Sequence, residues 1–254
     1  MCEGIDIRNY TKKINIFQNK KISSFEIIDY SYIVKNNFIP EFNENLTLIT
    51  DCFLEKAFCK GKYICLKFIG SDKYLISYCG KWDMKESKYD KFSISIKNKK
   101  IYFSDQKSFG KIILREKKDF LDIWNSIGID VLSKIFTKEK FKEIFNKKIK
   151  ISKSCKNISS LLIDQNFISS LELSLVSDIL YIANINPNTI SKLLNKTQIN
   201  CLYRSIKKIA IEKHIYKEKY EYKIYEKIKI NENYVEVFQT KKRKIYWLPE
   251  NHPY

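Results

Sequence analysis

The chain has 254 residues, of which 44% are hydrophobic and 30% charged. This globular composition excludes global disorder, and because no apolar run reaches about 18 residues we expect no membrane-spanning helix. The net charge of +18, from 47 basic and 29 acidic residues, favours a polyanion such as nucleic acid as the partner, although solubility combined with a coding bias toward Lys, Ile and Asn is the alternative explanation.

The first half of the chain predicts one helix followed by short strands. Apolar side chains recur at helical spacing in residues 3–17 and predict an amphipathic helix there, namely Ile7, Tyr10, Ile14 and Phe17. From Lys21 to Arg115, short apolar runs alternate with polar turns. That pattern is typical of an antiparallel β-sandwich or barrel.

The second half predicts helices and then a hairpin. Helical spacing returns from Asp119 to about Tyr216, where Thr137 is the predicted cap of a helix. A further helix is expected to end near Ala183, before Pro187, with Asn188 or Thr189 capping the next one. From Tyr222 onward, alternation predicts a hairpin with a basic turn. The expected domains are residues 1–118, 119–216 and 217–254.

The cysteines and histidines predict no metal site. The chain has seven cysteines, an odd number, and two histidines without a cysteine at ligand spacing, and it contains no C-x-x-C motif. We therefore expect reduced thiols in an intracellular protein, in the nucleus or the cytoplasm, with no structural zinc, no disulfide framework and no cofactor. An apolar signal segment is absent from the start MCEGIDIRNY.

Six segments, in chain order, resemble those of the formamidopyrimidine-DNA glycosylase and endonuclease VIII family of base-excision repair enzymes. The start MCEGID is similar to the family's MPEGPE. The others, with the family pattern after each, are AFCKGKYICLKF (57–68, RRGKYLLF), FSDQKSFG (103–110, FxDPRRFG), SIGIDVL (126–132, LGPDPL), the segment 161–187 (the helix–two-turns–helix) and KRKIYWLP (242–249, GRTTYFCP). Together they span nearly the whole chain and follow the layout predicted from periodicity.

The resemblance implies an α+β fold. An N-terminal antiparallel β-sandwich with a leading helix would precede a C-terminal helical domain, which carries the helix–two-turns–helix and ends in a β-hairpin. Leu248 and Asn251 stand where two zinc-binding cysteines of the family would be. The tail therefore resembles the family's zincless finger, in which packing by Trp247, Tyr246 and Phe238 would replace the metal.

The resemblance also implies catalysis by an N-terminal amine. The α-amine of Cys2, exposed by removal of Met1, would be the nucleophile, and an α-amine has a pKa near ~7.7–8.0 against ~10.4 for lysine. Glu3 would protonate the deoxyribose, Asp6 would be the second carboxylate, and Lys62 would be the strand lysine that contacts phosphate. The alternatives are charge stabilisation of a helix N-terminus for Glu3 and Asp6, and a solvated strand lysine for Lys62.

Cys2 is the largest departure from the family, which has proline at this position. Its amine is primary and can still form an imine. Its thiol could also close a thiazolidine with the aldehyde of an opened abasic sugar, so the chain could trap abasic sites covalently. The alternative is that Cys2 is a neutral substitution.

The resemblance gives several residues a role in DNA binding. Arg243 and Lys242 match the basic tip of the finger, for which a merely basic turn is the alternative. Phe109 matches an aromatic wedge that enters the helix when a base is flipped out, and a core strand residue is its alternative. Lys107 stands in one of the two arginine positions beside that wedge, so the intercalating arginine is missing.

The helix–two-turns–helix segment is eroded. Asp164 and Gln165 keep the family's Asp-Gln pair, but the glycine-rich turn that follows reads Ser-Leu-Glu-Leu over residues 170–173. Glu172 would repel a phosphate, and Asp178 replaces a family glutamate. We therefore expect weak DNA affinity from this motif and reduced activity.

The first hypothesis is a bifunctional DNA glycosylase and abasic-site lyase, acting as a monomer on DNA with oxidised bases or abasic sites. The second is a non-catalytic or covalently trapping protein that binds abasic sites or single-stranded DNA. The third is an unrelated basic interaction module whose motif matches arose by chance.

Overall fold

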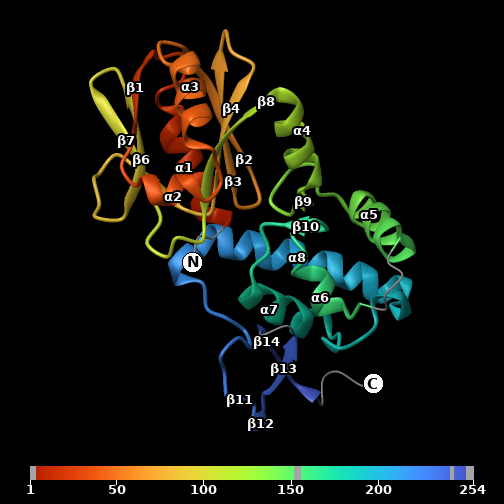
Figure 1. Ribbon diagram of the computed structural model, residues 1–254. Coiled ribbons are helices and arrows are strands. Elements are labelled where there is room, and N and C mark those ends of the chain that lie inside the picture. The colour runs from red at the N-terminus through yellow and green to blue at the C-terminus, as the bar shows by residue number, and fades with distance from the viewer. Residues whose placement is uncertain (1–3, 152–155, 241–242, 250–254) are drawn as a thin grey trace. The chain divides into compact units, whose positions relative to one another are not determined.

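The computed structural model describes residues 4–151, 156–240 and 243–249. The chain divides into two compact units, Met1–Ser126 and Ile127–Tyr254 (Figure 1). Cys2, Glu3 and Lys242 lie outside the described residues. None of the described helices is long and apolar enough to cross a membrane.

The first unit is a sandwich of two four-stranded antiparallel sheets, as the sequence predicts. One sheet has the order β1 (Ile22–Ile27), β6 (Asp90–Ile96), β7 (Lys99–Ser104), β5 (Lys81–Asp83). The other has the order β2 (Phe53–Lys60), β3 (Tyr63–Ile69), β4 (Lys73–Tyr78), β8 (Lys111–Glu116). Both sheets contribute to one hydrophobic core.

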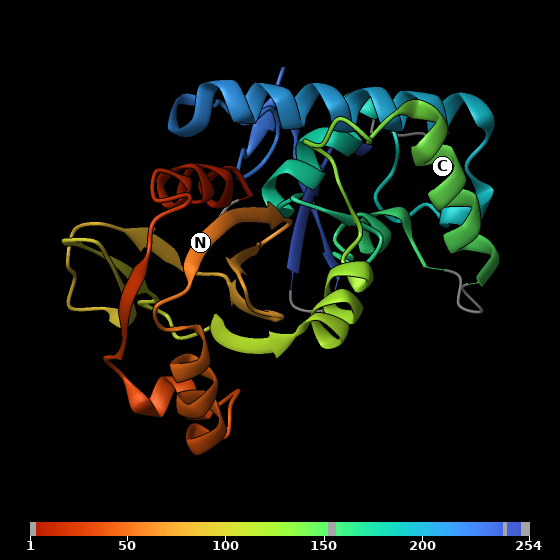
Figure 2. The same ribbon diagram turned by 90° about the horizontal axis from the view of Figure 1, so that it is seen from above.

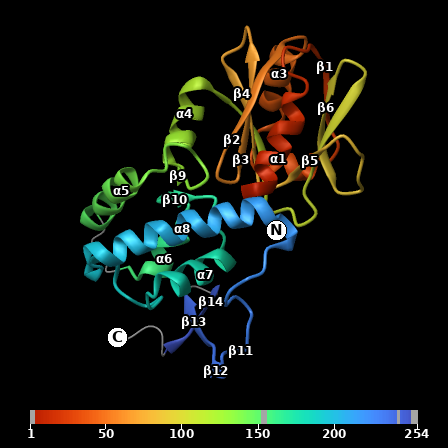
Figure 3. The ribbon, with the colours of Figure 1, turned by 180° about the vertical axis from the view of Figure 1, so that it is seen from behind.

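Strand and helix periodicity build this core. In β6, Phe92, Ile94 and Ile96 alternate with polar residues and are fully buried, as expected where one face of a strand meets a core. Helix α1 (Gly4–Asn15) buries Ile7 and Ile14 and packs against β2 and β5 (Figure 3).

Two helices interrupt the region that the sequence predicts as purely β. They are α2 (Tyr30–Val34) and α3 (Ile39–Ile49). Pro40 stands in the first turn of α3, where its missing N–H costs nothing. The buried residues Phe42, Leu46 and Ile49 then follow at helical spacing. After β8, α4 (Lys117–Ser126) ends the unit.

The second unit is mostly helical. Its α-helices are α5 (Lys138–Ile151), α6 (Ile158–Leu162), α7 (Leu173–Ala183) and α8 (Lys196–Tyr216). Figure 2 shows α8 as a straight rod, and α7 packs along it. A short parallel pair, β9 (Ile129–Asp130) and β10 (Ile168–Ser169), joins distant segments. Two 3-10 turns, η1 (Ser191–Leu193) and η2 (Lys217–Lys219), flank α8.

The predicted helix ends are partly correct. Thr137 Oγ1 accepts a bond from Lys140 N at the start of α5, as predicted, and α7 ends at Ala183. The prediction that Asn188 or Thr189 caps the next helix is wrong. Asn195 caps α8, and its side chain and that of Gln198 bond reciprocally to each other's backbone N–H.

The predicted terminal hairpin is present. Strands β13 (Glu236–Thr240) and β14 (Arg243–Trp247) pair antiparallel. They follow a smaller pair, β11 (Lys229–Ile230) and β12 (Asn233–Tyr234). Ile245 and Leu248 are buried, and Ile245 belongs to the core of the second unit.

Candidate functional site

A pocket of about 250 Å³ in the first unit brings together three residues that the sequence predicts as site residues. Asp6 comes from α1, and Lys107 and Phe109 come from the loop between β7 and β8. The remaining wall is supplied by α1, the turn between β4 and β5, the end of β7 and the same loop: Tyr10, Cys79, Gly80, Lys81, Ser104, Asp105 and Gln106. Two carboxylates, two lysines and two aromatic rings thus line a single hollow.

Phe109 is exposed rather than buried. Its side chain is 80% exposed and lies outside any strand, so the alternative that it belongs to the core is wrong. Lys107 beside it is also exposed. An aromatic ring held in solvent gains nothing from core packing, which leaves it available for contact with a ligand.

A buried aspartate holds the loop that carries Phe109. Asp105 Oδ2 accepts bonds from Gly110 N at 2.7 Å and from Tyr32 Oη at 2.9 Å. Burial, and then the bond to Asp105, raises the pKa of Tyr32. Sequence reasoning assigned no role to Asp105 or Tyr32, although Asp105 is the aspartate of the FSDQKSFG segment.

Glycine is required at two positions beside this pocket, because neighbouring atoms lie too close to the backbone there to leave room for a Cβ atom. Gly80 has φ +148°, and a Cβ there would lie 2.3 Å from the ring of Phe103. A Cβ on Gly110 would lie 2.3 Å from Tyr78 O. Any larger residue would push the two loops apart and open the pocket.

Lys62 lies beside the pocket wall, in the turn between β2 and β3 rather than within a strand. Its carbonyl oxygen accepts a bond from Cys79 N at 3.1 Å. Burial raises the pKa of the Cys79 thiol, and the positive charge of Lys62 opposes that shift. The positive charge of Lys62 therefore acts on this side of the pocket.

In the second unit, Asp164 and Gln165 hold the turn between α6 and α7. Asp164 Oδ2 pairs with Lys148 Nζ at 3.0 Å. The side-chain Nε2 of Gln165 donates to Leu171 O at 3.0 Å, and the backbone carbonyl oxygen of Gln165 accepts from Gly128 N at 2.8 Å. Both residues interact with other residues of the second unit, and these interactions stabilise the conformation of the turn.

Ser170 occupies a strained position in that turn. Its φ is +70°, in the left-handed region that favours glycine, and the family has glycine here. Its Oγ is buried without a hydrogen-bond partner in the structure. The backbone at Ser170 therefore has a conformation typical of glycine although the residue carries a side chain.

Replacing Ser170 by Gly is expected to stabilise the protein by about 1 kcal/mol, because it removes left-handed strain and an unsatisfied hydroxyl. Urea denaturation checks this. The matched control is Ser169→Gly, which removes the bond from Ser169 Oγ to Gly128 O and should destabilise. If both variants changed the free energy of unfolding in the same direction, the assignment of strain to Ser170 would be contradicted.

The terminal hairpin is fixed to α7. Tyr246 N donates to Ser177 Oγ at 3.1 Å, and Trp247 is 8% exposed. Arg243 is exposed and pairs with Thr240 at the turn end of the hairpin. The packing that sequence reasoning assigned to Trp247 and Tyr246 is therefore present, with Ile245 and Leu248 added to it.

Asp178 ties α7 to the segment that leads into the hairpin. This fully buried carboxylate accepts four bonds, from Tyr220 Oη, Lys223 N, Ile224 N and Tyr225 N, at 2.8 to 3.3 Å. The ring of Tyr225 then contacts that of Tyr246 in β14, with centroids 5.1 Å apart.

Alkaline pH is expected to loosen this region. Burial, and then Glu226, raises the pKa of Tyr225 to about 12, against about 10 in an unfolded chain. The folded state thus holds the phenol proton more tightly, so stability is intact below pH 10 and falls as the pH rises toward 12. Tyr225→Phe should flatten the decline measured by urea denaturation. The exposed Tyr234→Phe should not, and an equal effect of both would contradict the prediction.

Metal-binding groups do not gather in the described ranges. No set of three or more His, Cys, Asp or Glu side chains there could hold a metal ion. The described cysteines are free thiols, at positions Cys52, Cys59, Cys65, Cys79 and Cys201.

No protein-family model matches the chain. Among curated proteins, it is 31% identical over 153 residues to a formamidopyrimidine-DNA glycosylase of Arabidopsis thaliana, covering 60% of this chain and 37% of that protein. It is 25% identical over 204 residues to the enzyme of the same name from Lactococcus lactis subsp. cremoris, covering 74% and 70%. The chain thus spans little more than a third of the Arabidopsis relative.

Solved structures match over almost the whole chain. The Lactococcus lactis formamidopyrimidine-DNA glycosylase bound non-covalently to DNA with an abasic site has a TM-score of 0.80 at 20% identity, covering 98% of this chain and 99% of that one. The same protein with another DNA and an inhibitor has a TM-score of 0.82 at 20% identity, covering 99% and 100%. The predicted α+β fold and the family resemblance are therefore confirmed, at identities that fit a diverged sequence.

Proposed function

Starting from its resemblance to the formamidopyrimidine-DNA glycosylase and endonuclease VIII family, we propose that the chain is a DNA-repair glycosylase with abasic-site lyase activity. It acts as a monomer on DNA that contains oxidised bases or abasic sites. The observation that carries the proposal is the pocket lined by Asp6, Lys107 and Phe109. It lies in a unit with the fold of known glycosylases, and the chain carries a net charge of +18.

The proposed nucleophile is the α-amine of Cys2 after removal of Met1. Its unprotonated nitrogen attacks C1′ of the damaged nucleotide, and the bond to the base breaks with the electron pair leaving on the base. Glu3 donates a proton to the ring oxygen, which opens the sugar and leaves an imine at C1′. Loss of a proton from C2′ then expels the 3′ phosphate, so the strand is cut by β-elimination.

The other proposed site residues hold the DNA. Lys62 and the finger-tip pair Lys242 and Arg243 neutralise phosphates near the lesion. Phe109 enters the space that the flipped nucleotide vacates. The exposure of Phe109 and Arg243 supports these roles, because each side chain is available to a partner.

A second candidate function is covalent capture of abasic sites without cleavage, and Cys2 favours it. The amine and thiol of an N-terminal cysteine both bond to the aldehyde carbon of an opened abasic sugar. One water leaves, and a thiazolidine forms without any oxidant or reductant. Residues 170–173 lack the glycine-rich sequence of the family, which agrees with a protein that captures its substrate without catalytic turnover.

Variants at residue 2 separate the two functions. With abasic DNA, an imine gives a stable adduct only when borohydride is present, whereas a thiazolidine gives one without it. Cys2→Ser keeps a primary amine but no thiol, so it should retain the reductant-dependent adduct alone. Cys2→Pro should behave in the same way. Adding a few residues before Cys2 moves the amine away and should abolish both adducts, and an undiminished adduct in that variant would contradict both proposals.

A further inference from the structure

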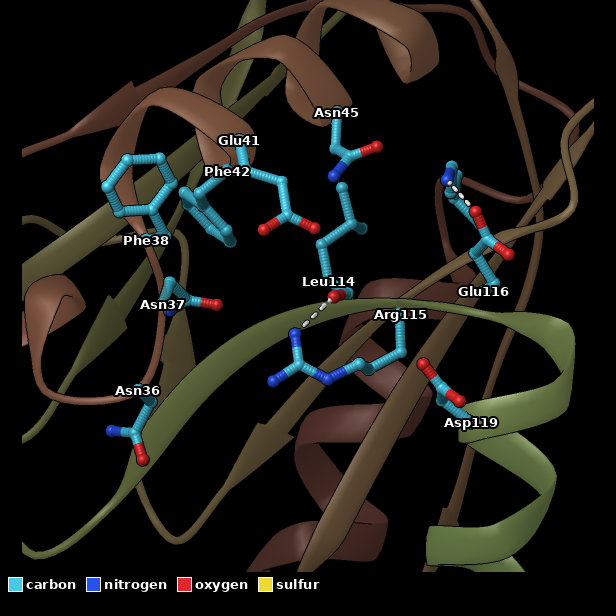
Figure 4. Close-up of a pocket in the computed structure, with 11 residues that line it drawn as sticks. Asn36, Asn37, Phe38, Glu41, Phe42, Asn45, Leu114, Arg115, Glu116 and Asp119 are labelled. Atoms are coloured by element: carbon cyan, nitrogen blue, oxygen red, sulfur yellow. Dashed lines mark hydrogen bonds and ion pairs between the residues drawn. The ribbon is translucent and has the colours of Figure 1, made fainter.

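A second hollow of the first unit, about 370 Å³ in volume, shares no lining residue with the pocket of Asp6 and Phe109. Figure 4 shows it between α3 and the region where β8 runs into α4. Its lining is mostly polar or charged: Asn36, Asn37, Phe38, Glu41, Phe42, Asn45, Lys73, Leu114, Arg115, Glu116 and Asp119. The proposed repair activity uses none of these residues.

Two carboxylates of this hollow have no partner among the described residues. Lys73 Nζ pairs with Glu116 at 2.7 Å. Glu41 and Asp119 make no ion pair or side-chain hydrogen bond with any residue that the structure describes. Both side chains are exposed, so each is open to a partner that enters from solvent.

A guanidinium faces the same hollow without pairing with those carboxylates. Arg115 Nη1 donates to Leu114 O at 2.7 Å, and no carboxylate of the described residues lies within ion-pair distance of it. Figure 4 shows Glu41 and Asn45 projecting from α3 on one side, with Arg115 and Asp119 on the other. Unlike charges thus share the hollow yet remain apart.

The side chain of Asn37 is held in the wall of the hollow. Asn37 Nδ2 donates to Ile33 O at 3.0 Å and to Ile112 O at 2.8 Å. Its Oδ1 is buried and has no hydrogen-bond partner in the structure. Buried polar atoms are normally satisfied, so this oxygen is an unusual feature of the wall of the hollow.

A ligand that fits these groups must offer an acceptor edge to Arg115 and a donor edge to a carboxylate. Guanine has both, since O6 and N7 accept from an arginine fork while N1–H and the 2-amino group donate to a carboxylate. Adenine would place its amino group against the arginine. Phe38, 71% exposed at the rim, offers a ring on which a base can stack.

We propose that this hollow binds a guanine base, with Arg115 donating to O6 and N7, Glu41 or Asp119 accepting from N1 and the 2-amino group, and Phe38 stacking on the ring. The same base chemistry is presented by a free nucleoside and by an unpaired guanine in a strand.

Equilibrium dialysis of the full chain with guanosine, inosine, adenosine and glycine tests the proposal. Guanosine should bind saturably. Inosine, which lacks the 2-amino group, should bind about 5- to 150-fold more weakly, and adenosine should bind more weakly than guanosine. Absence of saturable guanosine binding, equal binding of adenosine, or binding of the zwitterion glycine in place of guanosine would overturn the proposal.

Variants localise the binding. Arg115→Lys, the double variant Glu41→Gln with Asp119→Asn, and Phe38→Ala should each weaken guanosine binding. Glu44→Gln, on the same helix but outside the lining, should not, and an equal loss there would overturn the assignment. A thymine oligonucleotide with one central guanine, compared with the all-thymine strand, distinguishes the two sources. If the guanine-containing strand binds more tightly than the all-thymine strand and Arg115→Lys abolishes that difference, the ligand is a guanine within a strand. If the two strands bind equally while guanosine still binds, the ligand is the free nucleoside.

Discussion

Replacing Asp178 by Ala is expected to lower the free energy of unfolding by about 3 to 5 kcal/mol, because it leaves buried donors without an acceptor. Those donors are the Tyr220 hydroxyl and the backbone N–H groups of residues 223–225. A single methyl group cannot accept any of these bonds. Urea denaturation followed by circular dichroism measures the change.

Two variants control for the charge and for the site. Asp178→Asn keeps one acceptor oxygen, so its loss should be smaller than that of the alanine variant. Asp122→Ala, an exposed position in α4, should change the stability by no more than about 0.5 kcal/mol. If Asp178→Ala behaved like Asp122→Ala, the account of how α7 holds the segment before the hairpin would be wrong.

Replacing Glu3 by Gln is expected to reduce strand cleavage at an abasic site by roughly 10²- to 10⁴-fold, the range of a lost general acid. Glutamine keeps the size of the side chain but cannot deliver a proton to the sugar ring oxygen. Binding of the same DNA should persist, since the phosphate contacts assigned to Lys62 and Arg243 are unchanged. Single-turnover cleavage of an abasic oligonucleotide, with binding measured in parallel, checks both parts.

A matched glutamate serves as the control for this variant. Glu44→Gln, on α3, also removes one negative charge and should leave cleavage unchanged. Cleavage that survives Glu3→Gln would remove Glu3 from the proposed chemistry. Loss of cleavage together with loss of binding would instead assign Glu3 to positioning of the DNA.

The sequence predicted those parts of the fold that carry a regular apolar period. Helix α1 was visible because Ile7 and Ile14 stand on one helical face, and the terminal hairpin because β13 and β14 alternate. Helices α2 and α3 were missed because they are short and lie between segments with a strand pattern. The wrong cap at Asn188 or Thr189 has a similar cause, since a 3-10 turn follows there and Asn195 starts the long helix.

The candidate site was predictable only through family motifs. Asp6, Lys107 and Phe109 line one pocket, but no local pattern could show that Phe109 faces solvent. Its loop is set by a bond from Tyr32 to Asp105, 73 positions apart in the chain. Contacts between such distant residues follow from the tertiary fold and leave no period in the sequence.

The intact mass of the purified chain, before and after reaction with abasic DNA and borohydride, tests the central claim most directly. The account predicts a chain that begins at Cys2 and gains the mass of one DNA fragment, and peptide mapping should place that fragment on the first residue. A chain that keeps Met1 yet still gains the fragment, or a fragment attached to an internal lysine, would contradict it.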